Sequence, residues 1–200
     1  SENGNETCTS TSATAYTCGC DSGYYFEIVN GTPVCTQLLG NSCTDTMEII
    51  TEAGVYTGNT NANGYTNTFS STCGTTTNSS KDMIFQLEVA ERSEVTLEIT
   101  TASFTDSLLF LQQPCGTTLE CDDDDGEDSL SKIVRTLPAG TYFVVVDGYG
   151  TSNHGTFSLS VGITPSTDLC IPNPCTDLNK TVCTQNGQTT TCSCDAGYFA

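Results

Sequence analysis

The sequence predicts an all-β protein in which an antiparallel β-sandwich lies between two small disulfide-rich modules. Between about residues 38 and 165, apolar residues alternate with polar ones in short runs separated by Gly, Asn, Asp and Pro, which is the pattern of half-buried strands. Helix signals are nearly absent, because no long window keeps apolar residues at the helical period without a breaker. Nine of the thirteen cysteines lie outside this segment. We therefore expect three domains, at residues 1–37, 38–165 and 166–200.

The strand patterns are clearest in two neighbouring segments. From Met83 to Val89 every second residue is apolar, and the same alternation runs from Val95 to Thr101 after a connection of hairpin length. The run from Tyr142 to Val146 is apolar on both faces, which predicts a central strand that is covered on each side. Further strands are expected at Ser107 to Leu111, Leu130 to Leu137, Gly140 to Val146 and Gly155 to Val161, with weaker patterns at Glu48 to Thr51 and Tyr65 to Phe69.

The two terminal segments are polar and too small to close a hydrophobic core, so disulfides must hold them. The first follows the spacing C-x9-C-x-C-x14-C, and the second follows C-x4-C-x7-C-x8-C-x-C. The cysteines of the first are Cys8, Cys18, Cys20 and Cys35, and those of the second are Cys170, Cys175, Cys183, Cys192 and Cys194.

A short motif recurs in both terminal segments. The stretch from Cys194 to Tyr198 repeats the Cys-Asp-x-Gly-Tyr pattern of the stretch from Cys20 to Tyr24, at a distance of 174 residues. Because this distance is shorter than the chain, the sequence is best interpreted as one repeat period plus an overlap. That interpretation favours a tandem or polymeric structural protein.

Composition limits the classes of function. The chain has 24 acidic and 5 basic residues and a net charge of −19, which excludes binding to nucleic acid. So many cysteines indicate an oxidising, extracellular compartment, secreted or at the cell surface. No apolar run approaches the about 20 residues that cross a bilayer, so no membrane insertion is expected in this segment. No signal peptide is visible, and we expect that it was removed or lies upstream.

Two kinds of site are suggested by short motifs. Asn-x-Ser/Thr sequons occur in polar segments expected to be loops, in about the number that chance gives in a chain so rich in Ser and Thr. They lie at Asn5, Asn30, Asn78 and Asn179. No hydrolase or phosphate-binding motif is present, so we expect no enzyme activity and no catalytic residue.

An acidic run is the candidate metal site. Seven of the nine residues from Glu120 to Asp128 are acidic, and calcium takes about six to eight oxygen ligands. An EF-hand frame fails, because Lys132 would stand where a bidentate Glu is required. One interpretation is a calcium cofactor bound in a sandwich loop, with Asp122, Asp124 and Asp147 as candidate ligands. The alternative is a solvated acidic loop without an ion.

Several motifs of the middle segment resemble the bacterial pre-peptidase C-terminal (PPC) domain over about residues 81–162. They are the stretches from Asp106 to Leu111, from Leu137 to Tyr142, from Val146 to Tyr149 and from Gly155 to Leu159. The resemblance implies a jelly-roll-like β-sandwich. It also implies an accessory module of the kind found on secreted enzymes and surface proteins, with no catalytic group.

The terminal segments resemble parts of EGF-like domains, the first its last four cysteines and the second its first five. In that family the first cysteine joins the third, the second the fourth and the fifth the sixth. The resemblance therefore implies the pairs Cys20–Cys35, Cys170–Cys183 and Cys175–Cys192, and leaves Cys8, Cys18 and Cys194 without partners in the chain. Their partners then lie outside this sequence or in another subunit, unless a different pairing applies.

The four central cysteines allow three connectivities. We expect the sequence-local one, Cys43 with Cys73 and Cys115 with Cys121.

Together these features predict a non-catalytic extracellular structural protein, the repeat unit of a tandem or polymeric surface filament whose partners are copies of itself joined head to tail. Two alternatives stay open. One is an adhesion or glycan-binding module, with or without calcium, whose partners are glycans or cell-surface proteins. The other is the accessory region of a larger secreted enzyme.

Overall fold

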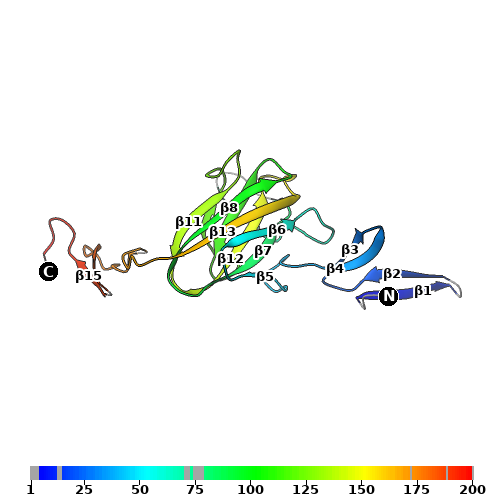
Figure 1. Cartoon of the computed structure of the whole chain (residues 1–200), viewed down its shortest axis with the longest axis horizontal. Coiled ribbons are helices and arrows are strands. Elements are labelled where there is room, and N and C mark those ends of the chain that lie inside the picture. The colour runs from blue at the N-terminus through cyan, green and yellow to red at the C-terminus, as the bar shows by residue number, and fades with distance from the viewer. Residues whose placement is uncertain are drawn as a thin grey trace.

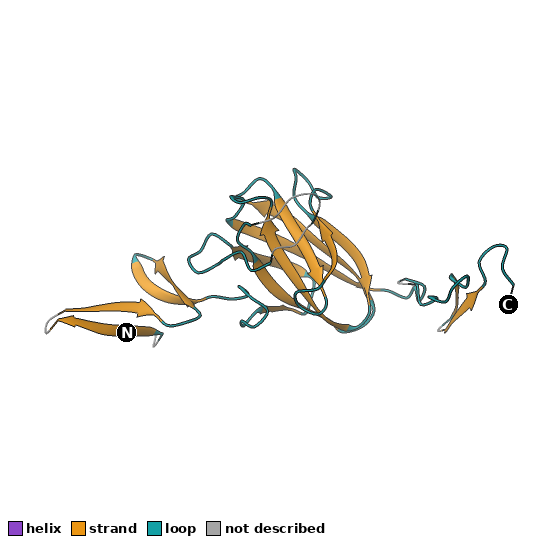
Figure 2. Ribbon diagram, turned by 180° about the vertical axis from the view of Figure 1, so that it is seen from behind, coloured by secondary structure: helices purple, strands orange, loops and turns teal. Residues whose placement is uncertain are grey.

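The computed structural model describes residues 5–12, 15–69, 73, 79–171, 173–187 and 189–199, and in these ranges it contains strands and no helix (Figure 2). A β-sandwich forms the middle of the molecule, and hairpins lie at the two ends of the chain on opposite sides of it (Figure 1). The all-β sandwich class predicted from the sequence is confirmed.

The sandwich consists of two sheets. The five-stranded sheet has the order β10-β9-β12-β7-β5, and the four-stranded sheet has the order β11-β8-β13-β6. Neighbouring strands are antiparallel except β5 and β7, which pair in parallel. The strands are β5 (Glu48–Ile50), β6 (Gly54–Asn59), β7 (Met83–Val89), β8 (Ser93–Ala102), β9 (Ser107–Gln112), β10 (Thr118–Asp122), β11 (Lys132–Leu137), β12 (Gly140–Gly148) and β13 (Thr156–Pro165).

The main core lies between the two sheets. Alternate residues of each strand point inward, as the period-two pattern predicts, and Leu97, Val144 and Leu159 are fully buried. Phe85 in β7 lies at the centre, with its ring edge-on to Tyr56 and to Phe157 at centroid distances of 6.5 and 6.1 Å.

A second apolar cluster covers the outer face of the five-stranded sheet. It is formed by Ile84, Phe110 and Val145, on which Phe69 and Cys73 pack from the segment before β7. The central strand β12 is therefore buried on both faces, as its apolar run predicted. Every residue of β9 is buried for the same reason.

Two strands of the sandwich escaped the sequence analysis, as did the strands of the terminal hairpins. The two in the sandwich are β6, in which two glycines look like turn residues, and β10, which opens the acidic run. A Cβ on Gly58 would lie 2.3 Å from the Phe157 ring, so this glycine allows close packing and does not mark a turn. Residues 65–69, expected as a weak strand, form a segment without regular secondary structure, whose backbone N–H groups are held by the side chains of Asn41 and Asp82.

The central disulfides differ from the predicted pairs. Cys43 is bonded to Cys115 and Cys73 to Cys121, so the sequence-local pairing is wrong. The physical reason is the second cluster. Because the segment before β7 packs across the outer face of the five-stranded sheet, its Cys73 meets Cys121 of the β9–β10 hairpin, and Cys115 of the same hairpin packs against this cluster.

The N-terminal segment consists of two hairpins. They are β1 (Glu6–Ser12) with β2 (Ala15–Cys20), and β3 (Tyr24–Val29) with β4 (Thr32–Gln37). Cys20 is bonded to Cys35, the expected pair. Cys8 and Cys18 were expected to be unpaired but are bonded to each other, because the register of the first hairpin places them directly opposite, with a Cα–Cα distance of 3.9 Å.

The C-terminal segment carries one hairpin, β14 (Val182–Asn186) with β15 (Thr189–Ser193). Two disulfides tie it to the preceding loop, Cys170–Cys183 and Cys175–Cys192, which are the expected pairs. Among the described residues Cys194 is the free cysteine. Within those residues there is also no helix with the length and apolar character needed to span a bilayer.

Candidate functional site

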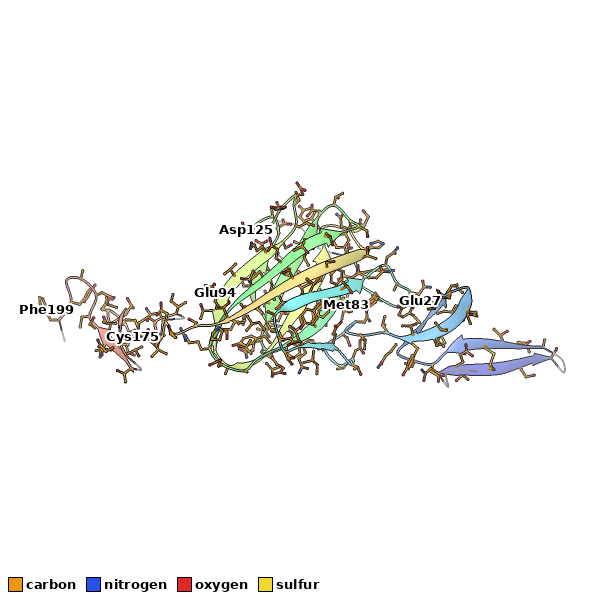
Figure 3. All side chains as sticks on the ribbon, viewed as in Figure 1. Glu27, Met83, Glu94, Asp125, Cys175 and Phe199 are labelled. Atoms are coloured by element: carbon orange, nitrogen blue, oxygen red, sulfur yellow. A yellow bond between two sulfur atoms is a disulfide. The ribbon has the colours of Figure 1, made fainter. Side chains whose placement is uncertain are left out.

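The acidic loop at one end of the sandwich is built by the pairing of β9 with β10. These strands are antiparallel, so the residues that follow β10 lie beside the residue that precedes β9. Asp123 and Asp124 come directly after β10, and Asp106 comes directly before β9. In Figure 3 the neighbouring Asp125 marks this loop at the edge of the sandwich.

Three carboxylates meet in this loop. One oxygen of each of Asp106, Asp123 and Asp124 lies within 4.8 Å of the others. Among the described residues, these three form the group of His, Cys, Asp or Glu side chains whose possible ligand atoms lie within this distance. The Oδ1 atoms of Asp106 and Asp123 are buried and have no hydrogen-bond partner. A hard cation such as calcium would satisfy both, with main-chain carbonyls and water completing its about six to eight ligands.

The negative charges of the carboxylates in this loop repel one another. Burial raises the pKa of Asp106, and the charge of Asp124 adds to the effect. Burial also raises the pKa of Asp123 to about 6, with further increases from the charges of Asp124, Asp106 and Asp122. Like charges and desolvation both disfavour the ionised form of these carboxyl groups. A bound cation would stabilise the ionised form and so lower these pKa values.

The carboxylates brought together are not the predicted set. Asp124 belongs to the group, whereas Asp122 and Asp147 lie outside it. Oδ2 of Asp122 accepts hydrogen bonds from the backbone of Lys132 (2.7 Å) and Asp125 (3.1 Å), so this side chain holds the loop to β11. Asp147 is buried in β12, and its Oδ1 accepts a hydrogen bond from the N–H of the next residue at 2.6 Å.

Asp106 and Asp123 were missed as members of the group. Asp123 is inside the acidic run, but nothing distinguishes it there from its neighbours. Asp106 precedes a strong strand pattern, and only the pairing of that strand with residues 118–122 brings it to the acidic run. A prediction of β10 would have supplied this signal.

The loop after the three carboxylates is closed on itself. The N–H of Gly126 donates to the carbonyl of Leu130 at 2.7 Å, and a Cβ on this glycine would lie 2.2 Å from that oxygen. Asp128 and Ser129 have φ angles of 53° and 60°, in the left-handed region that non-glycine residues rarely adopt. The loop is thus fixed in shape by its own backbone.

A second surface feature is a shallow hollow on the four-stranded sheet. It lies where β6, β13 and the end of β8 adjoin, and its lining is neutral and rich in hydroxyl groups. The polar side chains come from Thr57, Asn59, Thr101, Ser103, Thr156 and Ser158. On a chain of net charge −19, the residues that line this hollow include no ionised side chain.

The motif shared by the two chain ends folds in the same way at both. The N–H of Asp21 donates to the carbonyl of Asn5 at 3.0 Å, and the N–H of Asp195 donates to the carbonyl of Asn179 at 2.9 Å. The following turn is closed by Tyr24 N–H on the carbonyl of Asp21 at 3.1 Å, and by the equivalent pair of Tyr198 and Asp195 at 3.0 Å.

Side chains complete the same arrangement. The hydroxyl of Thr7 donates to Oδ1 of Asp21, and the hydroxyl of Thr181 donates to Oδ1 of Asp195. Gly23 and Gly197 have φ angles of 83° and 91°, which glycine adopts without strain. The turn around Asp195 therefore matches the turn around Asp21 in these hydrogen bonds. The adjoining hairpins differ, because Cys18 faces Cys8 and is bonded to it, whereas the equivalent Cys192 faces Cys183 and is bonded to Cys175.

The sequon asparagines occupy different environments. Asn30 is exposed in the β3–β4 turn, whereas Asn5 and Asn179 are half-buried. Asn78 lies outside the described residues. Glycosylation at these positions stays a prediction.

Solved structures that are similar to this chain include a collagenase domain and a lysozyme inhibitor. The pre-peptidase C-terminal domain of a collagenase from Bacillus anthracis has 13% sequence identity and a TM-score of 0.42, over 57% of this chain and 92% of that one. PliG of Aeromonas hydrophila, a periplasmic lysozyme inhibitor of g-type lysozyme, has 15% identity and a TM-score of 0.36, over 58% and 98%. No protein-family model and no curated protein matches the chain.

Proposed function

We propose that this chain is a non-catalytic extracellular structural protein, the repeat unit of a tandem or polymeric surface filament. EGF-like modules at its two ends join β-sandwiches head to tail, and the partners of each unit are copies of itself. Its place is outside the cell, secreted or at the cell surface.

The observation that carries this proposal is the repeated motif at the two ends of the sandwich. Asp21 and Asp195 accept equivalent hydrogen bonds from Thr7 and Thr181, and equivalent backbone hydrogen bonds surround them. Because this turn lies on both sides of the sandwich, it offers a common element through which successive sandwiches of a filament would be joined. Head-to-tail contacts of this kind give a filament when they do not close into a ring.

The chemistry of the chain suits such a role. Six disulfides join cysteines of the described residues, including both terminal segments, which have almost no core of their own. Disulfides of this kind persist outside the cell and slow unfolding and proteolysis. A surface filament needs this kinetic stability.

Imaging tests the proposal directly. Native material would be extracted gently, labelled with an antibody against the sandwich and viewed by negative-stain electron microscopy. We expect fibres with antibody at regular intervals. Discrete particles of single-unit mass, seen under conditions that keep the disulfides intact, would contradict the filament role.

A second candidate function is a calcium-assisted adhesion or glycan-binding module. Two observations favour it. The first is the cluster of three carboxylates formed by Asp106, Asp123 and Asp124, and the second is the hydroxyl-lined hollow on the four-stranded sheet. A third role, the accessory region of a larger secreted enzyme, rests on the motif resemblance to PPC domains and predicts a catalytic domain in the same polypeptide.

Calcium binding separates the second candidate from the first. Calcium at a hundredfold excess over its Kd should stabilise the chain by about 2.7 kcal/mol, seen as a higher Tm. Asp123→Asn should abolish this increase, and Asp177→Asn, an exposed carboxylate in the C-terminal segment, should not. A glycan array with and without EDTA then asks whether the ion supports sugar binding. An unchanged Tm in calcium would remove the calcium-assisted form of this role.

A further inference from the structure

The C-terminal end carries an uncovered group of three side chains. Cys194 is a free thiol, the side chain of Tyr198 is 54% exposed, and that of Phe199 is 97% exposed. Figure 3 shows Phe199 at the tip of the C-terminal segment, away from the sandwich.

The N-terminal copy of the same motif shows how these positions are covered. Cys20, the equivalent of Cys194, is bonded to Cys35 in β4, which is buried. The carbonyl of Gly23, the equivalent of Gly197, accepts a hydrogen bond from the N–H of Leu38 at 2.8 Å. The hairpin β3–β4 and the first residue of the sandwich segment therefore close this side of the motif.

The aromatic position is covered by the sandwich itself. Tyr25, the equivalent of Phe199, lies against Gly64, where an added Cβ would be 3.8 Å from the Cβ of Tyr25 and 3.3 Å from the side chain of Leu38. Tyr65 is close enough for its pKa, raised to about 12 mainly by burial, to be raised further by Tyr25. Its hydroxyl donates to the carbonyl of Leu39 at 2.8 Å, so the loop that receives Tyr25 is tied down.

From this equivalence we infer that Cys194, Gly197 and Phe199 form the docking surface for a second copy of residues 26–165, attached head to tail. The inference rests on the proposed function and gives the joint its residues. Cys194 bonds to Cys35 of the second copy, and the carbonyl of Gly197 accepts the hydrogen bond from Leu38 of that copy. Phe199 packs against Gly64 of that copy, in the place that Tyr25 takes in the first.

The new disulfide forms by thiol–disulfide exchange. The two cysteine thiols are oxidised to one disulfide, and one molecule of a small disulfide such as oxidised glutathione takes up the two electrons and two protons as two thiols. The Cys20–Cys35 bond of the first unit is not needed for this reaction and stays intact.

An extended chain tests the joint. Residues 1–199 are followed directly by a second copy of residues 26–165, which keeps the spacing of the first copy, and the product is secreted into a glutathione redox buffer. Peptide mapping without reduction should find Cys194 bonded to Cys35 of the second copy, with loss of its reactivity toward iodoacetamide. Hydrogen exchange should show protection of the N–H of Leu38 in the second copy.

Two matched variants of the extended chain probe the aromatic contact. Phe199→Ser should speed the exchange of that Leu38 N–H while the disulfide remains. Leu178→Ser removes a side chain of similar exposure, 91%, that lies outside the repeated motif, and it should have no effect. Equal exchange rates in both variants would contradict the aromatic docking.

A free or differently bonded Cys194 in the extended chain would overturn the inference. Its failure and that of the proposed function can be told apart. Native fibres in which Cys194 is a free thiol would leave the filament role standing and remove this joint. If the joint forms as inferred in the extended chain but the native material is monomeric, the joint would stand and the filament role would be contradicted.

Discussion

Asp82 is a carboxylate buried at the edge of the second apolar cluster, and it organises the segment before β7. Its Oδ2 accepts hydrogen bonds from the N–H groups of Thr68 (2.7 Å) and Phe69 (3.0 Å), whereas its Oδ1 is buried without a partner. Burial raises the pKa of Asp82 to about 6, and the two hydrogen bonds offset part of this increase. The residue thus fixes the backbone beside Phe69 at a cost in desolvation.

The raised pKa of Asp82 predicts that the free energy of unfolding decreases as the pH rises. The folded state holds the proton of Asp82 up to about pH 6, whereas the unfolded chain loses it near its ordinary value of 3.8. The stabilising contribution is therefore fully present below pH 3.8 and is lost as the pH rises through 6. Its size is about 3 kcal/mol, from a shift of about two pKa units.

Asp82→Asn should flatten this dependence, because the amide oxygen still accepts both hydrogen bonds and carries no charge. The free energy of unfolding would be measured in urea at pH 4, 5.5 and 7 with the disulfides intact. Asp177→Asn serves as the exposed control. The same decrease between pH 4 and 7 in the Asp82 variant and in the native chain would count against this role.

The acidic residues show how far single residues could be predicted. The acidic run identified the loop, since seven carboxylates in nine residues are conspicuous in any sequence. It did not identify the group within the loop, because the closeness of Asp106 to Asp123 comes from strand pairing. It also did not show that Asp122 holds the loop to β11, a role that depends on the backbone of Lys132.

At the scale of elements, β6 depends on the absence of a side chain at one position. Gly58→Ala would place a Cβ 2.3 Å from the Phe157 ring and 2.7 Å from the sulfur of Met83, inside the main core. We expect destabilisation by about 1–3 kcal/mol, since over-packed cores must shift side chains or backbone. Gly54→Ala in the same strand meets only the Tyr56 ring, at 3.7 Å, and is the matched control. Equal urea midpoints for the two variants would contradict this account of β6.

The central disulfides predict the thiol counts of paired variants. Replacing Cys43 and Cys115 together by Ala removes one bond and should add no free thiol. Replacing Cys43 and Cys73 together breaks two bonds and should add two thiols, those of Cys115 and Cys121. Titration with a thiol reagent in denaturant measures both. The opposite counts would restore the sequence-local pairing.

The elements that the sequence predicted are those whose signal is local. The strands from Met83 to Val89 and from Ser93 to Ala102 follow their alternating pattern, and β12 follows its apolar run. The central disulfides depend on which segment packs over which face, with sequence separations of 72 and 48 residues. No spacing of cysteines records that arrangement. The Cys8–Cys18 bond depends on the register of one hairpin, which the sequence alone did not give.

At the scale of the whole molecule, the stabilising apolar core lies in the sandwich. The terminal hairpins have little core of their own, and they leave the apolar residues Phe26, Ile28 and Val182 exposed. The links from the ends to the sandwich include the hydrogen bond from Arg92 Nε to the carbonyl of Asp168, at 2.8 Å, and the hydrogen bond from the N–H of Leu38 to the carbonyl of Gly23, at 2.8 Å. We therefore expect the sandwich to fold without the ends, and the ends to depend on their disulfides.

This division predicts that residues 38–165 fold alone. The segment keeps both sheets, both apolar clusters and the disulfides Cys43–Cys115 and Cys73–Cys121, so its thermal transition should lie within a few degrees of the main transition of the chain. Differential scanning calorimetry of the two proteins measures this, with the chain after selective reduction of its terminal disulfides as a further comparison. Loss of a cooperative transition in residues 38–165 would mean that the terminal modules belong to the same folding unit. The joint between units would then transmit stability along a filament, because each terminal module would contribute to the sandwich on which it docks.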